Sequence, residues 1–192
     1  MFSFHATKLY NSVEGGCLTY NDPSLVKKIY NLRNFGIQSE ELVEEVGTNG
    51  KMNEIQAAVG LLNLDLFQEE QEKRKCIKSF YNRELSKVNS IKIPQMPENT
   101  TDSYQYYPII VEDDYSLSRN ELYEKFKAKN ILTRKYFYPA CHDYECYQND
   151  LSVKLSNLEV VDDLKNRVLC LLYYGALKQQ DLDLIVEVIN KN

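Results

Sequence analysis

Long hydrophobic runs are missing from this sequence of 192 residues. No apolar stretch approaches the ~20 residues that a membrane-spanning helix needs, so we expect no such segment. The N-terminus lacks the basic region and the long apolar stretch of a signal peptide. The five cysteines are scattered and odd in number, which favours reduced thiols in the cytoplasm over a disulfide framework.

Charge of one sign forms no basic stripe and no long acidic tail either, although residues 37–45 are polar and acidic. The net charge is -5, and acidic and basic residues are interspersed along the chain. Without a basic stripe or a long acidic tail, nucleic acid is not an expected partner. Internal repeats and low-complexity tracts are also absent. The hydrophobic fraction of 43% and the charged fraction of 27% are ordinary for a folded soluble protein, so we expect one large or two small domains.

Strands are few in the first half of the chain. The stretch "GGCLTY" predicts a short strand. The stretch "NDPSLVKKIYNLRNFG" predicts a helix with Asp22 as its cap, Pro23 in its first turn and Gly36 at its end. The apolar stripe expected to be buried on this helix consists of Leu25, Ile29 and Leu32.

A strongly amphipathic helix is predicted next, because apolar residues recur at spacings of three and four. A long helix is predicted over residues 64–85. The Pro-containing stretch "IPQMPENTTDS" is the best boundary in the chain, which places one part at residues 1–90 and another at 91–192. The recurring apolar residues are Met52, Ile55, Val59, Leu62 and Leu66.

The second part has the pattern of a small α/β unit. Residues 104–112 predict a strand, in which Pro108 favours an edge or an irregular position. Residues 118–130 begin with Ser118 and have Glu121 three positions later, the spacing of a capping box. Residues 131–139 resemble a strand, whereas 157–172 and 181–190 have helical patterns. On the last helix, Leu182, Ile185, Val186 and Ile189 share one face.

Lys8 is the first candidate for chemistry. A lysine at the end of a strand, in a loop of small residues, can form a Schiff base with a carbonyl cofactor when its amine is partly desolvated. A lone lysine is more often simply solvated. Here Ser3 lies five residues earlier and could place a hydroxyl near an anionic group, and the glycine pair Gly15 and Gly16 lets the backbone return close to Lys8.

Three stretches together resemble a known family. "SFHATK" followed by "EGG", then "GTNGKMNEIQAAVGLLNL", then "RKYFYPACHDYECY" are similar to motifs of the DegT/DnrJ/EryC1/StrS sugar aminotransferases, in the same order across nearly the whole chain. These are pyridoxal 5'-phosphate enzymes of the aspartate-aminotransferase fold. The resemblance implies an α/β fold, namely the C-terminal portion of the PLP-dependent transferase fold: the remainder of the large domain (1–90) and a small α/β domain (91–192).

The resemblance also implies roles for individual residues. Lys8 would hold the cofactor and act as the base that moves a proton. Ser3 matches a serine that hydrogen-bonds the cofactor phosphate, and Asn49 matches an asparagine that reaches the cofactor of the neighbouring subunit in a homodimer. Lys51 occupies the adjacent basic position. The alternatives are a backbone hydrogen bond for Ser3 and a turn role for Asn49, which precedes a glycine.

Tyr138 and His142 would lie on a loop that contacts the substrate, according to the same resemblance. Their alternative is a tyrosine-rich packing segment. The neighbouring Cys141 and Cys146 suggest zinc, but their spacing does not match that of paired "CxxC" sites and no second cluster supplies further ligands. We therefore expect no metal.

The family relationship implies an amino donor, glutamate, and an acceptor that is a dTDP-linked keto-6-deoxyhexose. It also implies cofactor contacts that lie upstream of the lysine, among them an aspartate that pairs with the pyridine nitrogen. Only seven residues precede Lys8 here, so the sequence resembles the C-terminal half of such an enzyme. The alternative is a truncated or split, non-catalytic fragment that needs a separate N-terminal half. Such a chain would expose apolar surface at Leu25, Ile29, Ile55 and Val59.

Overall fold

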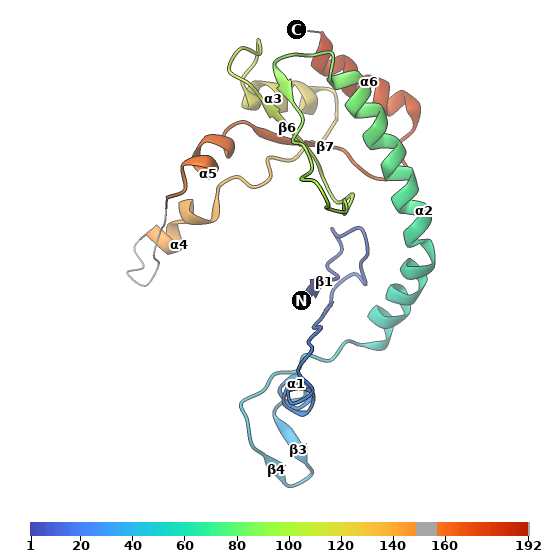
Figure 1. The fold of residues 1–192 in the computed structure, drawn as a ribbon, viewed down its shortest axis with the longest axis vertical. Coiled ribbons are helices and arrows are strands. Elements are labelled where there is room, and N and C mark those ends of the chain that lie inside the picture. Colours follow the sequence, from blue (N-terminus) through green and yellow to red (C-terminus); the bar gives the residue numbers. More distant parts are fainter. Residues whose placement is uncertain (149–156, 192) are drawn as a thin grey trace. The chain divides into compact units, whose positions relative to one another are not determined.

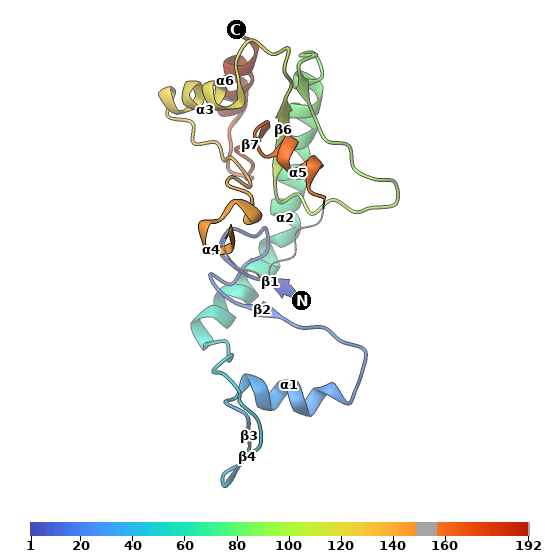
Figure 2. The ribbon, with the colours of Figure 1, turned by 90° about the vertical axis from the view of Figure 1, so that its left-hand side faces the viewer.

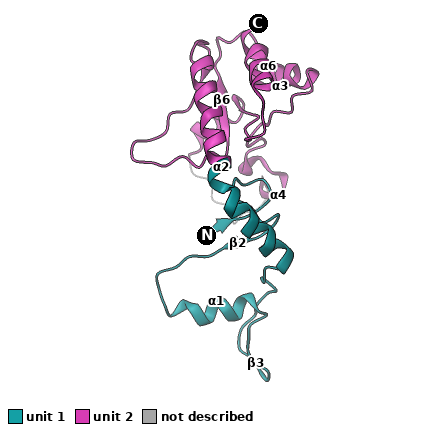
Figure 3. Cartoon of the chain, turned by 90° about the vertical axis from the view of Figure 1, so that its right-hand side faces the viewer, with its two compact units in different colours: residues 1–69 teal, residues 70–192 magenta. Residues whose placement is uncertain are grey.

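The computed structural model describes residues 1–148 and 157–191. It divides into two compact units, Met1–Glu69 (unit 1) and Glu70–Asn192 (unit 2), coloured separately in Figure 3. The division lies within helix α2 (Glu54–Leu85) and not after residue 90, because the C-terminal part of this helix contributes to the core of unit 2. Assignment of the two parts to a large and a small domain of a longer fold stays a prediction. No helix in the described part is long and apolar enough to cross a membrane.

Unit 1 contains two small antiparallel hairpins and one short helix. Strand β1 (Phe2–Ser3) pairs with β2 (Gly16–Cys17), with Ser3 opposite Gly16. Helix α1 (Leu25–Arg33) leads to the hairpin of β3 (Ile37–Ser39) and β4 (Leu42–Val43), which Figure 2 shows beyond the end of the helix. The predicted strand over 15–20 is therefore confirmed, although only two of its residues pair.

Helix α1 confirms the predicted helix but not its buried stripe. The Asp22 carboxylate accepts a hydrogen bond from the Ser24 N–H at 2.9 Å, and Gly36 ends the turn after the helix with a φ of +76°. Leu25 is 37% exposed, Ile29 and Leu32 are only half-buried, and the one buried residue of the helix is an asparagine. The stripe is exposed because no other described segment covers it.

Helix α2 unites the two helices predicted from the sequence. Its face that packs within unit 1 is not the apolar one: the Asn63 amide donates to the Asn11 carbonyl at 2.9 Å, and Gly60 is buried. The predicted apolar face is instead largely open, with Ile55, Leu62 and Leu66 exposed by 77%, 65% and 58%. The helical period was therefore predicted correctly, and the exposure of Ile55 agrees with the expectation that this chain alone leaves apolar surface open.

Unit 2 is built on a three-stranded antiparallel sheet. The strand order is β5 (Ile91–Lys92), β6 (Tyr107–Val111), β7 (Val168–Leu171). The C-terminal part of α2, together with α3 (Arg119–Ala128) and α6 (Gln179–Asn190), contributes side chains to the same core as the sheet (Figure 1). Fully buried members of this core include Tyr81, Leu85, Ile109, Leu122, Phe126, Leu169, Ile185 and Ile189.

Pro108 lies in β6, the central strand of the sheet, whereas the sequence predicted an edge strand or an irregular position for it. The sheet nevertheless satisfies the constraint behind that prediction, because proline has no N–H to donate to a second neighbour. β5 pairs only with Ile110 and Val111, so at Pro108 the strand has a partner on the β7 side alone, where it lies opposite Cys170. β6 is therefore locally an edge at its proline.

The helix signals of the second half were mostly reliable. The capping box of α3 is present, with the Ser118 N–H donating to the Glu121 carboxylate at 2.7 Å and the Glu121 N–H donating to Ser118 Oγ at 3.3 Å. On α6 the four residues predicted to share a face, Leu182, Ile185, Val186 and Ile189, are all buried.

Two predicted elements were wrong. Residues 131–139 form no strand and pair with β7 only through an isolated bridge between Arg134 and Cys170. Residues 157–172 are not one helix: α5 (Glu159–Leu164) ends early, and the apolar residues that follow form β7. A short apolar run suits a buried strand and a buried helix equally well. A 3-10 turn, η1 (Cys141–Asp143), and the four-residue α4 (Glu145–Gln148) complete the described elements.

Candidate cofactor and substrate sites

Lys8 lies in an ordered turn that follows β1. Its backbone N–H donates to the His5 carbonyl at 2.9 Å, and the Asn11 amide donates to the Lys8 carbonyl at 3.3 Å. Within the turn, His5 Nδ1 lies 2.9 Å from Thr7 Oγ1. The Lys8 side chain is half-buried, and no described carboxylate forms an ion pair with it. The turn therefore presents an amine that no acidic side chain neutralises.

The glycine pair brings the chain back along β1. The Phe4 N–H donates to the Gly15 carbonyl at 2.9 Å. A Cβ on Gly15 would lie 2.7 Å from Met52 Cε, and one on Gly16 would lie 2.7 Å from the Phe2 carbonyl oxygen. A larger residue at position 16 would push the two strands apart, whereas at position 15 the φ of +141° is what favours glycine. The glycines therefore keep the Lys8 turn anchored to its strand.

Ser3 lines an apolar groove of about 820 Å³ within unit 1, between the β1–β2 hairpin and α1. Its hydroxyl accepts a hydrogen bond from the His5 N–H at 3.4 Å, so the backbone role considered from the sequence is present in this structure. The side chain is nevertheless exposed and keeps further capacity for hydrogen bonding. Thr48 and Gly50, which flank Asn49, line the same groove.

Asn49 and Lys51 lie beside the end of α1. Lys51 Nζ donates to Asn34 Oδ1 at 2.9 Å and lies 4.3 Å from the centroid of the Phe35 ring. Asn49 forms an isolated bridge with Asn34, and its exposed side chain makes no hydrogen bond to another described residue. Neither of them lines the groove that Ser3 lines, and nor does Lys8, so unit 1 does not gather all four predicted cofactor residues around one cavity.

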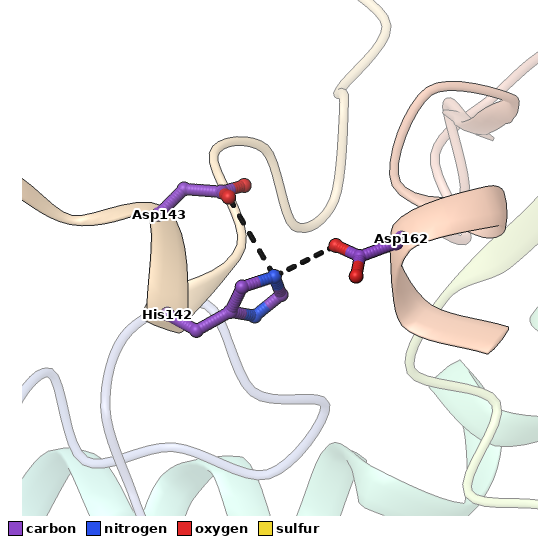
Figure 4. Close-up of side chains that lie close together, drawn as sticks. All are labelled: His142, Asp143 and Asp162. Carbon is purple, nitrogen blue, oxygen red and sulfur yellow. Dashed lines mark hydrogen bonds and ion pairs between the residues drawn. The ribbon is translucent and has the colours of Figure 1, made fainter. Parts of the chain in front are cut away.

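Tyr138 and His142 have different surroundings in unit 2. The Tyr138 ring centroid lies 5.0 Å from the guanidinium carbon of Arg119. His142 Nε2 lies 2.8 Å from Asp162 Oδ1 and 3.5 Å from Asp143 Oδ1, as Figure 4 shows. The predicted substrate loop thus carries one partly exposed ring and one imidazole that is already held by carboxylates.

A lysine completes the cluster around His142. Lys165 Nζ donates to Asp143 Oδ1 at 2.9 Å and to Asp162 Oδ1 at 2.8 Å. These hydrogen bonds lower the pKa of both carboxyl groups and raise the pKa of Lys165. The ligand atoms of His142, Asp143 and Asp162 lie within 4.8 Å of one another, but the ammonium group of Lys165 already balances the carboxylates.

Sequence reasoning did not find this cluster. Asp162 lies 20 residues after His142, and no local pattern connects them. The zinc alternative involved Cys141 and Cys146, which are not among the clustered ligand atoms. All five cysteines are free thiols. The cluster joins η1 to α5 and so fixes the loop that carries His142.

Comparison with known proteins defines the class of this fold. The structure of DesI in the presence of its TDP-sugar product matches with a TM-score of 0.89 and 30% sequence identity, over 99% of this chain and 48% of that chain. A DegT DnrJ EryC1 StrS aminotransferase from Brucella abortus matches with a TM-score of 0.85 and 27% sequence identity, over 98% of this chain and 49% of that chain. The fold is therefore a portion of the PLP-dependent sugar aminotransferase fold.

The sequence comparison gives the family. The model of the DegT/DnrJ/EryC1/StrS aminotransferase family matches residues 1–190, and the chain belongs to this family. A dTDP-4-amino-4,6-dideoxy-D-glucose transaminase of Shigella dysenteriae is 35% identical over 191 residues, which are 100% of this chain and 52% of that protein. An Escherichia coli protein of the same name is 38% identical over 87% of this chain and 45% of its own length. The chain thus spans about half the length of these relatives.

The residues of unit 1 fit part of what pyridoxal phosphate requires. A half-buried amine without a carboxylate partner, held in an ordered turn, fits a covalent anchor for a carbonyl group. An exposed serine hydroxyl on the preceding strand fits a phosphate contact. Lys8 and Ser3 would hold the cofactor in this way.

Proposed function

We propose that this chain is the Lys8-bearing, C-terminal half of a pyridoxal 5'-phosphate-dependent aminotransferase. The reaction would move an amino group from glutamate to a dTDP-linked keto-6-deoxyhexose, in deoxysugar biosynthesis for cell-surface polysaccharide such as O-antigen. The observation that carries the proposal is the ordered turn with an unneutralised Lys8 amine. The names of the two curated relatives support the substrate class.

Each predicted residue has one task in this proposal. Lys8 Nζ anchors the cofactor and then takes and returns the proton at the reacting carbon of the substrate. Ser3 donates its hydroxyl hydrogen to the cofactor phosphate. When bound, pyridoxal phosphate supplies the electron sink that the reaction needs. Asn49 and Lys51 would serve the neighbouring subunit of a homodimer, an assignment supported by the exposure of both side chains.

Tyr138 and His142 contact the nucleotide-linked sugar in this proposal. Because Asp162 holds Nε2 of His142, the substrate would meet the imidazole at its other ring nitrogen. The five free thiols suit a reducing compartment, and we place the reaction in the cytoplasm.

The proposal is tested by trapping the cofactor. The purified chain is mixed with pyridoxal phosphate, reduced with borohydride and digested, and the modified lysines are mapped by mass spectrometry. We expect modification at Lys8 to exceed that at Lys92, an exposed lysine of unit 2. Lys8→Arg should remove the absorbance band of the bound cofactor, while the control Lys92→Arg keeps it. Equal modification of all exposed lysines in a chain shown to be folded by circular dichroism would contradict cofactor binding by this chain alone.

A second candidate is a non-catalytic fragment that requires a separate N-terminal half. The observation that favours it is the open apolar surface of unit 1: the groove of about 820 Å³ and the exposed residues Leu25, Ile55 and Leu62. Such surface is typical of an interface. Under this candidate, Lys8 is modified only after the chain is mixed with the half of the Shigella dysenteriae relative that it does not cover.

A further inference from the structure

The Lys8 turn, residues 4–15, packs against α2 at Gly60. A Cβ on Gly60 would lie 3.2 Å from the hydroxyl oxygen of Tyr10 and 3.3 Å from Ser12 Cβ. Gly60 is buried, and Ser12 is only 1% exposed. The turn and the helix are therefore in close contact, although they are distant from each other in the sequence.

The side-chain amide of Asn63 on α2 adds a polar contact to this packing. It donates to the Asn11 carbonyl at 2.9 Å and lies 3.4 Å from Asn11 Oδ1. Asn11 in turn donates its own side-chain amide to the Lys8 carbonyl at 3.3 Å. Asn63 is half-buried, so water competes less for its N–H groups than at an exposed position. Two successive amides thus connect α2 to the main chain of Lys8.

The same Asn11 side chain supports an unfavourable backbone conformation further along the turn. Val13 has a φ of +67°, a value that β-branched residues rarely adopt. Its N–H donates to Asn11 Oδ1 at 3.3 Å, and the Ser12 hydroxyl donates to the Glu14 carbonyl at 2.8 Å. Such a conformation persists only where the surrounding contacts hold it. We therefore expect the turn to relax when Asn11 loses its contact with α2.

The position of the Lys8 main chain limits where its amine can reach. The flexible stem of a lysine lets the amine sample many positions, and a fixed main chain reduces their number. Anchoring a cofactor and moving a proton both require the nitrogen at a defined place, since a misplacement of about 1 Å can cost on the order of 100-fold in rate. Asn63 and Asn11 supply this restraint with uncharged groups. They hold the turn without placing beside the amine a carboxylate that would form an ion pair with it.

We propose that Asn63 is a positioning residue for Lys8. Its amide, acting through Asn11, holds the main chain of Lys8 where the amine can anchor pyridoxal phosphate and exchange a proton with the substrate. The chemical role of Lys8 in this inference rests on the proposed function. The contacts from Asn63 to Lys8 lie entirely within unit 1, so the chain of residues 1–192 is sufficient for the test.

The test compares variants of Asn63 by borohydride trapping of pyridoxal phosphate. Asn63→Ala removes the amide at a helical position, where alanine is well tolerated, and Asn63→Gln keeps it. The matched control Gln68→Ala removes an exposed amide from the same helix. In Asn63→Ala, the ratio of modification at Lys8 to that at Lys92 should fall by about ten-fold. The ratio should be largely retained in Asn63→Gln and unchanged in Gln68→Ala.

The visible circular dichroism of the trapped cofactor separates positioning from the amount of cofactor bound. The signal per mole of cofactor depends on one fixed orientation of the chromophore. It should therefore fall in Asn63→Ala and stay unchanged in Gln68→Ala. An unchanged signal per mole in Asn63→Ala would show that Asn63 affects only the amount bound, which contradicts positioning.

Trace acetylation of the lysines gives a readout that needs no cofactor. Relative to Lys92, Lys8 should be acetylated faster in Asn63→Ala than in the parent chain, because the released amine leaves its half-buried position. Unchanged acetylation of Lys8 in Asn63→Ala would overturn the proposal. Equal effects of Asn63→Ala and Gln68→Ala, or equal losses of trapping in Asn63→Ala and Asn63→Gln, would overturn it too.

Failure of this proposal is distinguishable from failure of the proposed function. If the parent chain is not trapped at Lys8 while Asn63→Ala speeds its acetylation, the proposed function is rejected and the positioning by Asn63 is kept. Retention of full trapping at Lys8 in Asn63→Ala would reject the positioning and keep the proposed function.

Discussion

Unit 1 and unit 2 differ in where their apolar side chains lie. Every buried hydrophobic residue of the described chain belongs to unit 2, beginning at Ile77. In unit 1 the buried side chains are polar, namely those of Ser12 and Asn31. The ring–ring contacts described within unit 1 are Phe4 with Tyr10, at a centroid distance of 4.9 Å, and Tyr10 with Phe67, at 6.4 Å.

The difference shows that the two units are stabilised in different ways. In unit 2, side chains of α2, α3 and α6 share one closed core with those of a three-stranded sheet. Unit 1 has two-stranded hairpins, which are marginal alone, and a helix whose apolar stripe is open. Local hydrogen bonds hold the Lys8 turn, but no buried hydrophobic side chain of unit 1 stabilises it. We infer that unit 2 folds by itself and that unit 1 is completed by further polypeptide.

The largest expected difference comes from one substitution made at two positions of α2. Leu85 is fully buried in unit 2, whereas Leu62 is 65% exposed in unit 1. Leu85→Ala should lower the free energy of unfolding by about 2–5 kcal/mol. Leu62→Ala should change it by less than about 0.5 kcal/mol. Urea unfolding measures both, and similar losses would remove the distinction between the units.

A smaller effect is expected at the N-terminus of α3. Ser118→Ala removes the hydroxyl that accepts from the Glu121 N–H, while the backbone N–H of residue 118 can still donate to the Glu121 carboxylate. The loss of this cap should cost about 1 kcal/mol. The matched control is Ser79→Ala on α2, since Ser79 Oγ donates only to the carbonyl four residues earlier. Equal unfolding midpoints for the two variants would show that the box contributes nothing to unit 2.

The cluster around His142 predicts a pH window. The pKa values of Asp143 and Asp162 are lowered from 3.8, so their contribution is complete above that pH and is lost as the pH falls through the lowered values. The pKa of Lys165 is raised from 10.5, so its contribution is complete below 10.5 and is lost as the pH rises through the raised value. The protection of the amides of residues 141–148, measured relative to an unstructured peptide at the same pH, should be constant between these limits. Lys165→Gln should lower this protection throughout the window, and unchanged protection would refute the stabilising role of the cluster.

The smallest effect on stability is expected on the open face of unit 1. Ile55→Ser combined with Leu66→Ser should reduce self-association and the binding of an apolar dye, while the unfolding midpoint of unit 2 stays unchanged. The control is Val160→Ser with Val161→Ser, which alters exposed residues of unit 2. If the two double variants reduce dye binding equally, the apolar face of α2 in unit 1 binds the dye no better than other exposed apolar residues do.

The sequence predicted elements where local signals suffice. Capping residues and the helical period placed α1, α3 and α6, and the glycine pair indicated the close return of the chain beside β1. The predictions from sequence were wrong where contacts with distant segments determine the structure. β7 is a strand because β6 lies beside it, and the stripe of α1 is exposed because nothing described covers it.

The sites show the same limit. Lys8 and Ser3 were identified from a local motif, and whether they bind cofactor stays a prediction. The partners of His142 could not be predicted, because Asp162 and Lys165 reach it only through the folded chain. Arg119 lies on another element than Tyr138, and only the structure brings its guanidinium under that ring.

Hydrogen–deuterium exchange of the chain, resolved by peptide mass spectrometry, tests the central claim most directly. If unit 2 closes its own core and unit 1 does not, peptides covering β6, β7 and α6 should exchange slowly, through global unfolding. Peptides covering β1, β2 and α1 should exchange orders of magnitude faster. Equal protection of α1 and β7 in the chain alone would contradict the account.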